Sequence, residues 1–191
     1  MRVISGEQGG LKLKPVPGKQ TRPTTDKVKE SIFNMIGPYF EGGQVLDLFA
    51  GSGALGIEAI SRGMDKGFFI EAQHQAVQTI QTNLTHTKLS DKATVYKNDS
   101  LRGLKAVISR GETFQLIVID PPYAKAELYI KDALEKINGS EVLERGGLIV
   151  CETAASSELP HFEHLSIIRS ERYGETKITI YERVNVVEES S

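Results

Sequence analysis

The chain has 191 residues, of which 39% are hydrophobic and 25% are charged, a balance typical of a globular domain with a substantial core and not of a disordered chain. No apolar run approaches the roughly 20 residues that cross a bilayer, and the first residues lack the apolar core of a signal peptide. The single cysteine, Cys151, cannot form an internal disulfide, which fits a reducing compartment. We therefore expect a cytoplasmic protein with no membrane partner.

The net charge of −2 hides an uneven distribution. Residues 1–30 hold seven Lys or Arg and three Asp or Glu, so this segment carries +4 and the remainder of the chain −6. A basic arm on an acidic body can bind a phosphate backbone, although charge alone favours a solvated charged segment. The candidate RNA-binding residues are Arg2, Lys12, Lys14, Lys19 and Arg22.

The first 40 residues predict an extension that precedes the main domain. Residues 1–20 carry several Gly and Pro between short apolar runs, which indicates an arm or a small hairpin. The following RPTTDKVKESIFNMIGP predicts a helix that is capped by Thr24 or Thr25 and stopped by Gly37-Pro38. One face of this helix is apolar, with Val28, Ile32, Met35 and Ile36.

From residue 44 the pattern alternates between apolar runs and amphipathic stretches. The predicted strands are 44–49, 66–71, 93–97, 114–120 and 147–152. The stretches between them place apolar residues on one face, at Ala76, Val77, Ile80 and Leu84 and again at Leu101, Leu104 and Ile108. Apolar strands separated by helices indicate a parallel sheet that is covered on both faces.

The end of the chain has a different pattern. Two strand-like runs, 165–172 and 175–184, surround Tyr173-Gly174 and predict a closing antiparallel hairpin, followed by an acidic tail. We expect an organisation of three parts: a basic arm and helix over 1–40, a main domain over 41–184 and the tail over 185–191.

The first strand runs into a glycine-rich loop, DLFAGSGALG. Gly51, Gly53 and Gly56 match G-x-G-x-x-G between a strand and a helix, where glycines let the backbone turn tightly and approach a ligand closely. Nicotinamide-dependent oxidoreductases and methyltransferases share this motif, so the loop alone leaves both open.

Acidic residues at the strand ends favour S-adenosylmethionine over a dinucleotide. Asp47 lies four residues before Gly51, where a carboxylate can pair with a ligand ammonium and would repel a pyrophosphate. Glu71 ends the second strand, in position to accept hydrogen bonds from ribose hydroxyls, and this acid fits NAD equally well. Asp99 follows the third strand and can accept a hydrogen bond from an adenine amine. Helix capping or solvent exposure is the alternative role for these acids.

The fourth strand ends in Asp120, Pro121, Pro122 and Tyr123. The prolines stiffen the loop, so the Asp120 carboxylate and a proline carbonyl become fixed acceptors for the hydrogens of an exocyclic amine. Tyr123 can stack on a nucleic-acid base. Catalysis would then be mostly positioning, without a metal, and the four histidines show no metal-ligand spacing. The alternative is a proline-rich turn that only ends a strand.

The whole chain resembles the RsmD-type family, the class I methyltransferases that modify guanine N2 in small-subunit (16S) ribosomal RNA. The resemblance rests on three segments: RPTTDKVKESIFN (22–34), LDLFAGSGALGIEAISRG (46–63) and VIDPPY (118–123). It implies a Rossmann-like, seven-stranded α/β sheet with helices on both faces and a small N-terminal extension. It also implies a monomer that acts on rRNA within an assembling 30S particle.

The resemblance also implies a division of roles. S-adenosylmethionine would bind, and S-adenosylhomocysteine would leave, at Asp47, Ala50, Gly51, Ser52, Gly53, Glu71, Asn98 and Asp99. The target amine would lie at Asp120 to Tyr123. One residue departs from the family pattern: Gln73 stands where an acid is more usual, which leaves Glu71 as the sole acid there.

Three other functions are weighed against this one. A DNA amino-methyltransferase acting on adenine N6 or cytosine N4 shares the loop chemistry, but the chain is short for a separate DNA-recognition domain. A nucleotide-dependent oxidoreductase would leave Asp47 and the DPPY loop unexplained. A non-catalytic ribosome-assembly factor would not need these intact acids.

Overall fold

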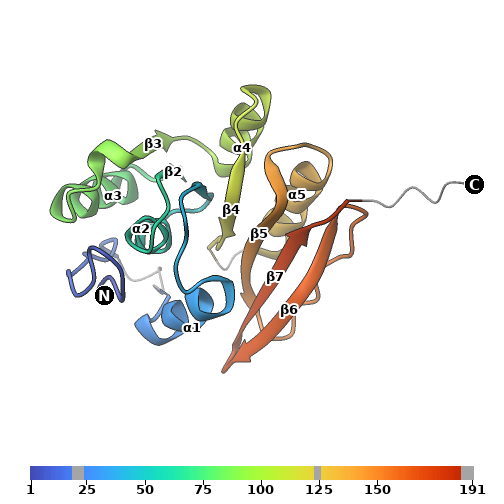
Figure 1. Ribbon diagram of the computed structural model, residues 1–191, viewed down its shortest axis with the longest axis horizontal. Coiled ribbons are helices and arrows are strands. Elements are labelled where there is room, and N and C mark those ends of the chain that lie inside the picture. Colours follow the sequence, from blue (N-terminus) through green and yellow to red (C-terminus); the bar gives the residue numbers. More distant parts are fainter. Residues whose placement is uncertain (19–23, 123–125, 186–191) are drawn as a thin grey trace, which may run out of the picture.

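The computed structural model describes residues 1–18, 24–122 and 126–185. Its centre is one seven-stranded sheet in the order β3-β2-β1-β4-β5-β7-β6 (Figure 1). Strands β1 to β5 run parallel, and β7 runs antiparallel to both of its neighbours. The strands are β1 (Gln44–Asp47), β2 (Lys66–Glu71), β3 (Ala93–Lys97), β4 (Phe114–Ile119), β5 (Leu143–Ala154), β6 (Leu165–Tyr173) and β7 (Thr176–Arg183). The predicted Rossmann-like sheet with a closing antiparallel hairpin is confirmed.

Two predicted strands differ from the structure by more than one residue at an end. The first was expected over 44–49 but ends at Asp47, because the chain there turns into the glycine-rich loop. The fifth was expected over 147–152 but begins at Leu143, which pairs with Phe114 before an irregularity in the register. Gly146 has a φ of +77° at this irregularity, which lets the strand continue through a conformation that other residues rarely adopt.

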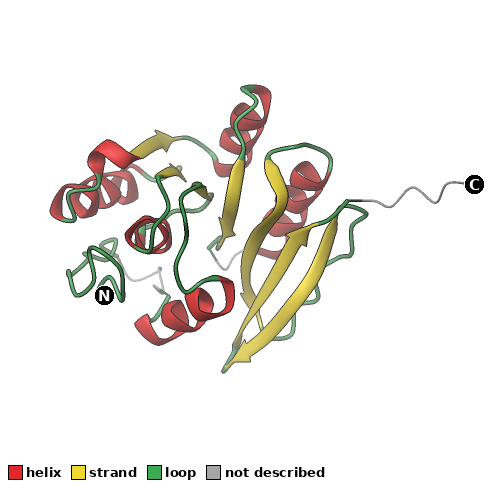
Figure 2. Cartoon of the chain, in the orientation of Figure 1, coloured by secondary structure: helices red, strands yellow, loops and turns green. Residues whose placement is uncertain are grey.

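Helices cover both faces of the sheet, as predicted (Figure 2). They are α1 (Asp26–Ile36), α2 (Ala54–Ser61), α3 (His74–His86), α4 (Ser100–Ser109) and α5 (Ala126–Asn138), with a short 3-10 helix at Ser90–Lys92. Successive strand residues alternate between two cores, so that Val45 packs with α1 to α3 and Leu46 packs with α4 and α5. Among the helices of the described ranges, none has the length and apolar character needed to cross a membrane.

The basic N-terminal segment is a small packed hairpin. Arg2 and Lys12 form an antiparallel bridge, and the Val3 and Leu13 side chains are buried in the core that α1, α2 and α3 share. The expectation of a hairpin is therefore confirmed, and the backbone of this segment is not a solvated tail. Lys12 and Lys14 nevertheless expose their side chains.

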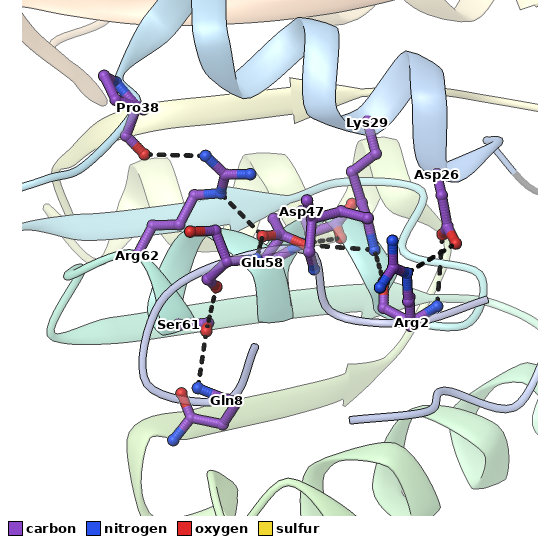
Figure 3. A network of polar contacts seen from close by, with 12 residues as sticks. Arg2, Gln8, Asp26, Lys29, Pro38, Asp47, Glu58, Ser61 and Arg62 are labelled. Atoms are coloured by element: carbon purple, nitrogen blue, oxygen red, sulfur yellow. Dashed lines mark hydrogen bonds and ion pairs between the residues drawn. The ribbon is translucent and has the colours of Figure 1, made fainter. Parts of the chain in front are cut away.

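A buried charge network ties this hairpin to α1 and α2 (Figure 3). The Glu58 carboxylate of α2 is fully buried and accepts hydrogen bonds from the backbone N–H groups of Ile4 and Ser5. Its oxygens also lie 2.8 Å from Arg62 Nε and 3.3 Å from Lys29 Nζ. One carboxylate thus joins three segments that are distant in the sequence.

The predicted apolar face of α1 packs against the core, and Lys29 is buried beside it. Ile32 is fully buried, Val28, Met35 and Ile36 are half-buried against the same core, and Lys29 and Phe33 are further buried residues of this helix. Desolvation lowers the pKa of Lys29, and the Glu58 carboxylate opposes that shift. The Glu58 carboxylate, 29 positions away in the sequence, is what stabilises the Lys29 charge in the core.

We predict that Glu58→Ala destabilises the protein by about 3–5 kcal/mol, because it leaves two buried cations without their counter-ion. Urea unfolding measures this change. Glu41→Ala, at an exposed position, is the matched control and should stay within about 0.5 kcal/mol of the parent. A loss below about 1 kcal/mol for Glu58→Ala would show that the network does not hold the extension in place.

Candidate functional site

A cavity of about 470 Å³ opens at the carboxyl ends of the parallel strands. This is the edge at which open α/β sheets bind ligands, and the volume lies within the usual range of ligand pockets. The structure brings most of the predicted site residues into its wall: Asp47, Ala50, Gly51, Ser52, Glu71, Asp99, Asp120, Pro121 and Pro122.

Some predicted residues lie elsewhere. Gly53 does not line the cavity but caps α2 with a φ of +82°, so its contribution is to the shape of the turn. Asn98 is exposed and is not part of the cavity wall. Lys19, Arg22 and Tyr123 fall outside the described residues.

Asp47 is a buried acceptor beneath the glycine-rich loop. Its side chain is 2% exposed, and its Oδ2 accepts a hydrogen bond of 3.1 Å from the Gly56 N–H. Gly56 permits this approach, because a Cβ there would lie 2.4 Å from the Phe69 ring. Burial raises the pKa of Asp47 to about 7, with Glu71 adding to the shift and the Gly56 N–H opposing it. A carboxylate in this state gains from a cationic ligand.

Glu71 is held by the backbone of two loops. Its Oε1 accepts from the Gly51 N–H at 3.1 Å, and its Oε2 accepts from the Gln73 N–H at 2.7 Å. Because Gln73 contributes its backbone to this contact, the unusual side chain at that position does not change how Glu71 is oriented. Gly51 has a φ of +56°, which strains any residue with a side chain.

Asp99 caps helix α4. Its Oδ1 accepts from the backbone N–H groups of Leu101 and Arg102, at 3.1 and 3.0 Å. The capping role that the sequence left open is therefore present. Asp99 also lines the cavity, so a hydrogen bond to a ligand is compatible with the cap.

A group that the sequence did not reveal lies beside Asp120. The Thr24 hydroxyl is 3.2 Å from Asp120 Oδ2 and 2.9 Å from Glu152 Oε2, and all three residues line the cavity. Thr24 is therefore not the helix cap, a role that Thr25 takes by accepting from the Val28 N–H. Burial and the Glu152 carboxylate raise the pKa of Asp120 well above its usual range.

Two cavity-lining aromatic residues were also missed. Phe49 follows β1 and Tyr129 belongs to α5, and their ring centroids lie 5.9 Å apart with a tilt of 32°. They give the cavity that Asp120 also lines an apolar wall, against which a flat ring system can pack.

Comparison with known proteins identifies the family. The family model described as "Conserved hypothetical protein 95" matches residues 1–182. YlbH of Bacillus subtilis, provisionally named an rRNA methyltransferase, is 50% identical over 184 residues, which cover 96% of this chain and 99% of that protein. Ribosomal RNA small subunit methyltransferase D of Escherichia coli is 31% identical over 185 residues, which cover 96% of this chain and 90% of that protein. The chain belongs to the RsmD-type family of class I methyltransferases.

The structural comparison agrees. A Thermus thermophilus protein solved under the label TTHA0928 superposes on this RsmD-type methyltransferase with a TM-score of 0.82 and 30% identity, over 95% of this chain and 99% of that one. Membership of the family removes the oxidoreductase alternative. Within the described ranges, no group of three or more His, Cys, Asp or Glu side chains could hold a metal ion.

The buried charge at Asp47 predicts a pH-dependent stability cost in this RsmD-type methyltransferase. The pKa of about 7 in the folded protein exceeds the usual value of an unfolded Asp, about 3.9. The loss in the free energy of unfolding is absent below about pH 4, grows as the pH rises toward 7 and is complete above about pH 7. Asp47→Asn should therefore raise the free energy of unfolding at pH 8 by an amount on the order of 2–4 kcal/mol, and with it Tm, and should give no gain near pH 4.

Thermal melts across this pH range make the measurement. Asp91→Asn, an exchange at an exposed position, should leave Tm unchanged at every pH and serves as the control. A parent protein that is more stable than Asp47→Asn at pH 8 would contradict the assignment of Asp47 as a strained, ligand-ready carboxylate.

Proposed function

We propose that this protein transfers a methyl group from S-adenosylmethionine to the exocyclic N2 amine of a guanine in small-subunit ribosomal RNA. The proposal rests mainly on the observation that one cavity holds acidic side chains in two separate places, beside the glycine-rich loop and at the end of β4. Asp47 and Glu71 flank the glycine-rich loop, and Asp120 stands on the rigid Pro121-Pro122 loop. The Escherichia coli relative is named for methylation of the same RNA class.

The cavity fits the proposed cofactor by its chemistry. Asp47 can accept from the amino group of the ligand, and each Glu71 oxygen retains a lone pair for a ribose hydroxyl after its backbone bond. Two carboxylates beside the glycine turn would repel the pyrophosphate of a dinucleotide. When bound, S-adenosylmethionine supplies an electrophilic methyl group on a sulfonium.

Asp120 would orient and deprotonate the target amine. The nitrogen lone pair of a guanine amine is delocalised into the ring, so hydrogen bonds to its protons from fixed acceptors favour the pyramidal geometry of attack. As the N–C bond forms and the methyl–sulfur bond breaks with its electron pair on sulfur, one N–H proton would pass to Asp120. Because burial and Glu152 raise its pKa, Asp120 is a stronger base than an ordinary aspartate and is better suited to accept that proton.

We predict that Asp120→Ala lowers methyl transfer by at least about 100-fold and leaves cofactor affinity within about threefold of the parent. The loss appears in turnover because the missing contact is needed most in the transition state. The assay is transfer of labelled methyl to small-subunit particles from a strain that lacks the gene, with calorimetric titration of S-adenosylhomocysteine. Asp91→Ala is the control. Near-normal turnover of Asp120→Ala would contradict the catalytic role of Asp120.

The N-terminal hairpin is a candidate RNA surface. The Lys14 backbone is anchored to Asn83 of α3 by two hydrogen bonds, and Pro15 and Val16 line the cavity mouth. The exposed Lys12 and Lys14 side chains therefore lie near the site where a base would enter. Arg2, in contrast, already has a partner, because its Nε lies 3.7 Å from Asp26. We propose that residues 1–40 act as an RNA-binding extension of the 41–184 methyltransferase domain, within an assembling 30S particle.

We predict that Lys12→Ala combined with Lys14→Ala weakens RNA binding and lowers the slope of log affinity against log salt by roughly 1.5, since each lost phosphate contact removes about 0.7–0.9. Point substitutions are preferred to truncation, because Val3 and Leu13 belong to the core. Lys92→Ala with Lys105→Ala, two exposed lysines outside the hairpin, makes a charge-matched control. An unchanged slope in the hairpin variant would show that these lysines do not contact RNA.

A further inference from the structure

Glu152 and Asp120 form a carboxylate pair at the ends of neighbouring strands. Asp120 follows β4, Glu152 lies on β5, and both reach the same Thr24 hydroxyl, at 3.2 and 2.9 Å. Two carboxylates that contact one hydroxyl lie close enough together to meet the same small ring system. Both residues line the cavity and are half-buried, so a base placed against Asp120 would also meet Glu152.

The pair has more acceptor capacity than Thr24 can satisfy. A hydroxyl carries one proton and can donate to only one of the two carboxylates at a time. The other carboxylate faces a like charge in a partly desolvated cavity, a repulsion that raises the pKa of Asp120 in the free protein and that a ligand with N–H donors relieves. The complementary ligand therefore presents at least two adjacent N–H donors.

We infer that Glu152 accepts a hydrogen bond from the ring N1–H of the target guanine while Asp120 accepts from the adjacent N2 amine, so that the pair selects guanine. This inference rests on the proposed function and assigns the residue that sets its base specificity. Guanine offers N1–H and N2–H side by side on its Watson–Crick edge, the edge by which enzymes read an extruded base. Thr24, from the segment before α1, would position the two carboxylates.

The same pair would reject the other amine-bearing bases. In adenine and cytosine, the ring nitrogen beside the exocyclic amine is an acceptor, whose lone pair would face the Glu152 carboxylate. A site built to accept from an N–H leaves its own acceptor unpaired when that donor is missing, and such sites discriminate strongly. The specificity would therefore come from repulsion of the wrong base as well as attraction of the right one.

The test compares guanine with 2-aminopurine, which keeps the amine at position 2 but has an acceptor at N1. Small-subunit particles are reconstituted on rRNA that carries either base at the methylated position, and kcat/KM is measured for the parent and for Glu152→Gln. The parent should prefer guanine by at least about 100-fold. Glu152→Gln should be less active on guanine than the parent is. Its kcat/KM values on guanine and 2-aminopurine should differ by no more than about tenfold, because the new amide can donate to the N1 acceptor of 2-aminopurine.

The comparison of ratios removes the effect of the missing O6 in 2-aminopurine, which is the same for both enzymes. Glu158→Gln, at an exposed position after β5, should behave as the parent. A Tm and an S-adenosylhomocysteine affinity equal to those of the parent establish that Glu152→Gln is folded. If its Tm falls, Glu152→Asp, whose side chain is shorter, replaces it. An unchanged guanine preference in either variant overturns the role of Glu152. A parent enzyme that leaves guanine N2 unmethylated overturns the proposed function instead.

Discussion

The arrangement of this protein depends on the buried carboxylate of Glu58. Lys29, Arg62 and two backbone N–H groups of the N-terminal hairpin converge on it, and none of these charges has access to solvent. Burying three charges is costly unless every partner is in place, so the network favours one docking of the hairpin, α1 and α2 over all others. The start of α1 is fixed as a result, and this places Thr24 between Asp120 and Glu152.

The cavity gathers several carboxylates, and the described residues of its wall include no Lys, Arg or His side chain. Asp47 and Asp120 are both shifted toward protonation by burial and by neighbouring acids. Such an arrangement destabilises the free protein, and ligands that bring positive charge or N–H donors relieve the repulsion when they bind. The cation of the proposed cofactor and the donor edge of guanine are ligands of this kind. Rigid elements hold the acids in place: the glycine turn holds Glu71, and the Pro121-Pro122 loop follows Asp120.

Much of this architecture was predictable from local sequence patterns. The apolar run that became β2 was found with the bounds that the structure has, because buried parallel strands are short and continuous in hydrophobicity. The edge strand β3 was also predicted with its observed bounds, although none of its residues is fully buried. Asp47, Glu71 and Asp120 were found because parallel strands end at one edge of the sheet. Glu152 ends an apolar run in the same way as Glu71 does, and that signal was available but was not used.

The remaining features depend on tertiary contacts that a local pattern does not contain. Lys29 is buried because Glu58 lies opposite it, and a lysine in an amphipathic helix otherwise indicates the solvent face. Thr24 and Thr25 are equivalent as caps in the sequence, and only the position of β4 and β5 assigns Thr24 to the carboxylate pair. Asp99 could serve as cap or ligand, and the fold showed that the cap is formed.

The proposed activity of this RsmD-type methyltransferase is methylation of guanine N2 in small-subunit rRNA. The most direct measurement is mass spectrometry of the nucleosides of that RNA, purified from a strain lacking the gene and from the same strain carrying the gene on a plasmid. The deletion strain should contain one N2-methylguanosine fewer per small-subunit RNA, and the plasmid should restore it. An unchanged content of N2-methylguanosine, or the loss of a methylated adenine or cytosine instead, would contradict it.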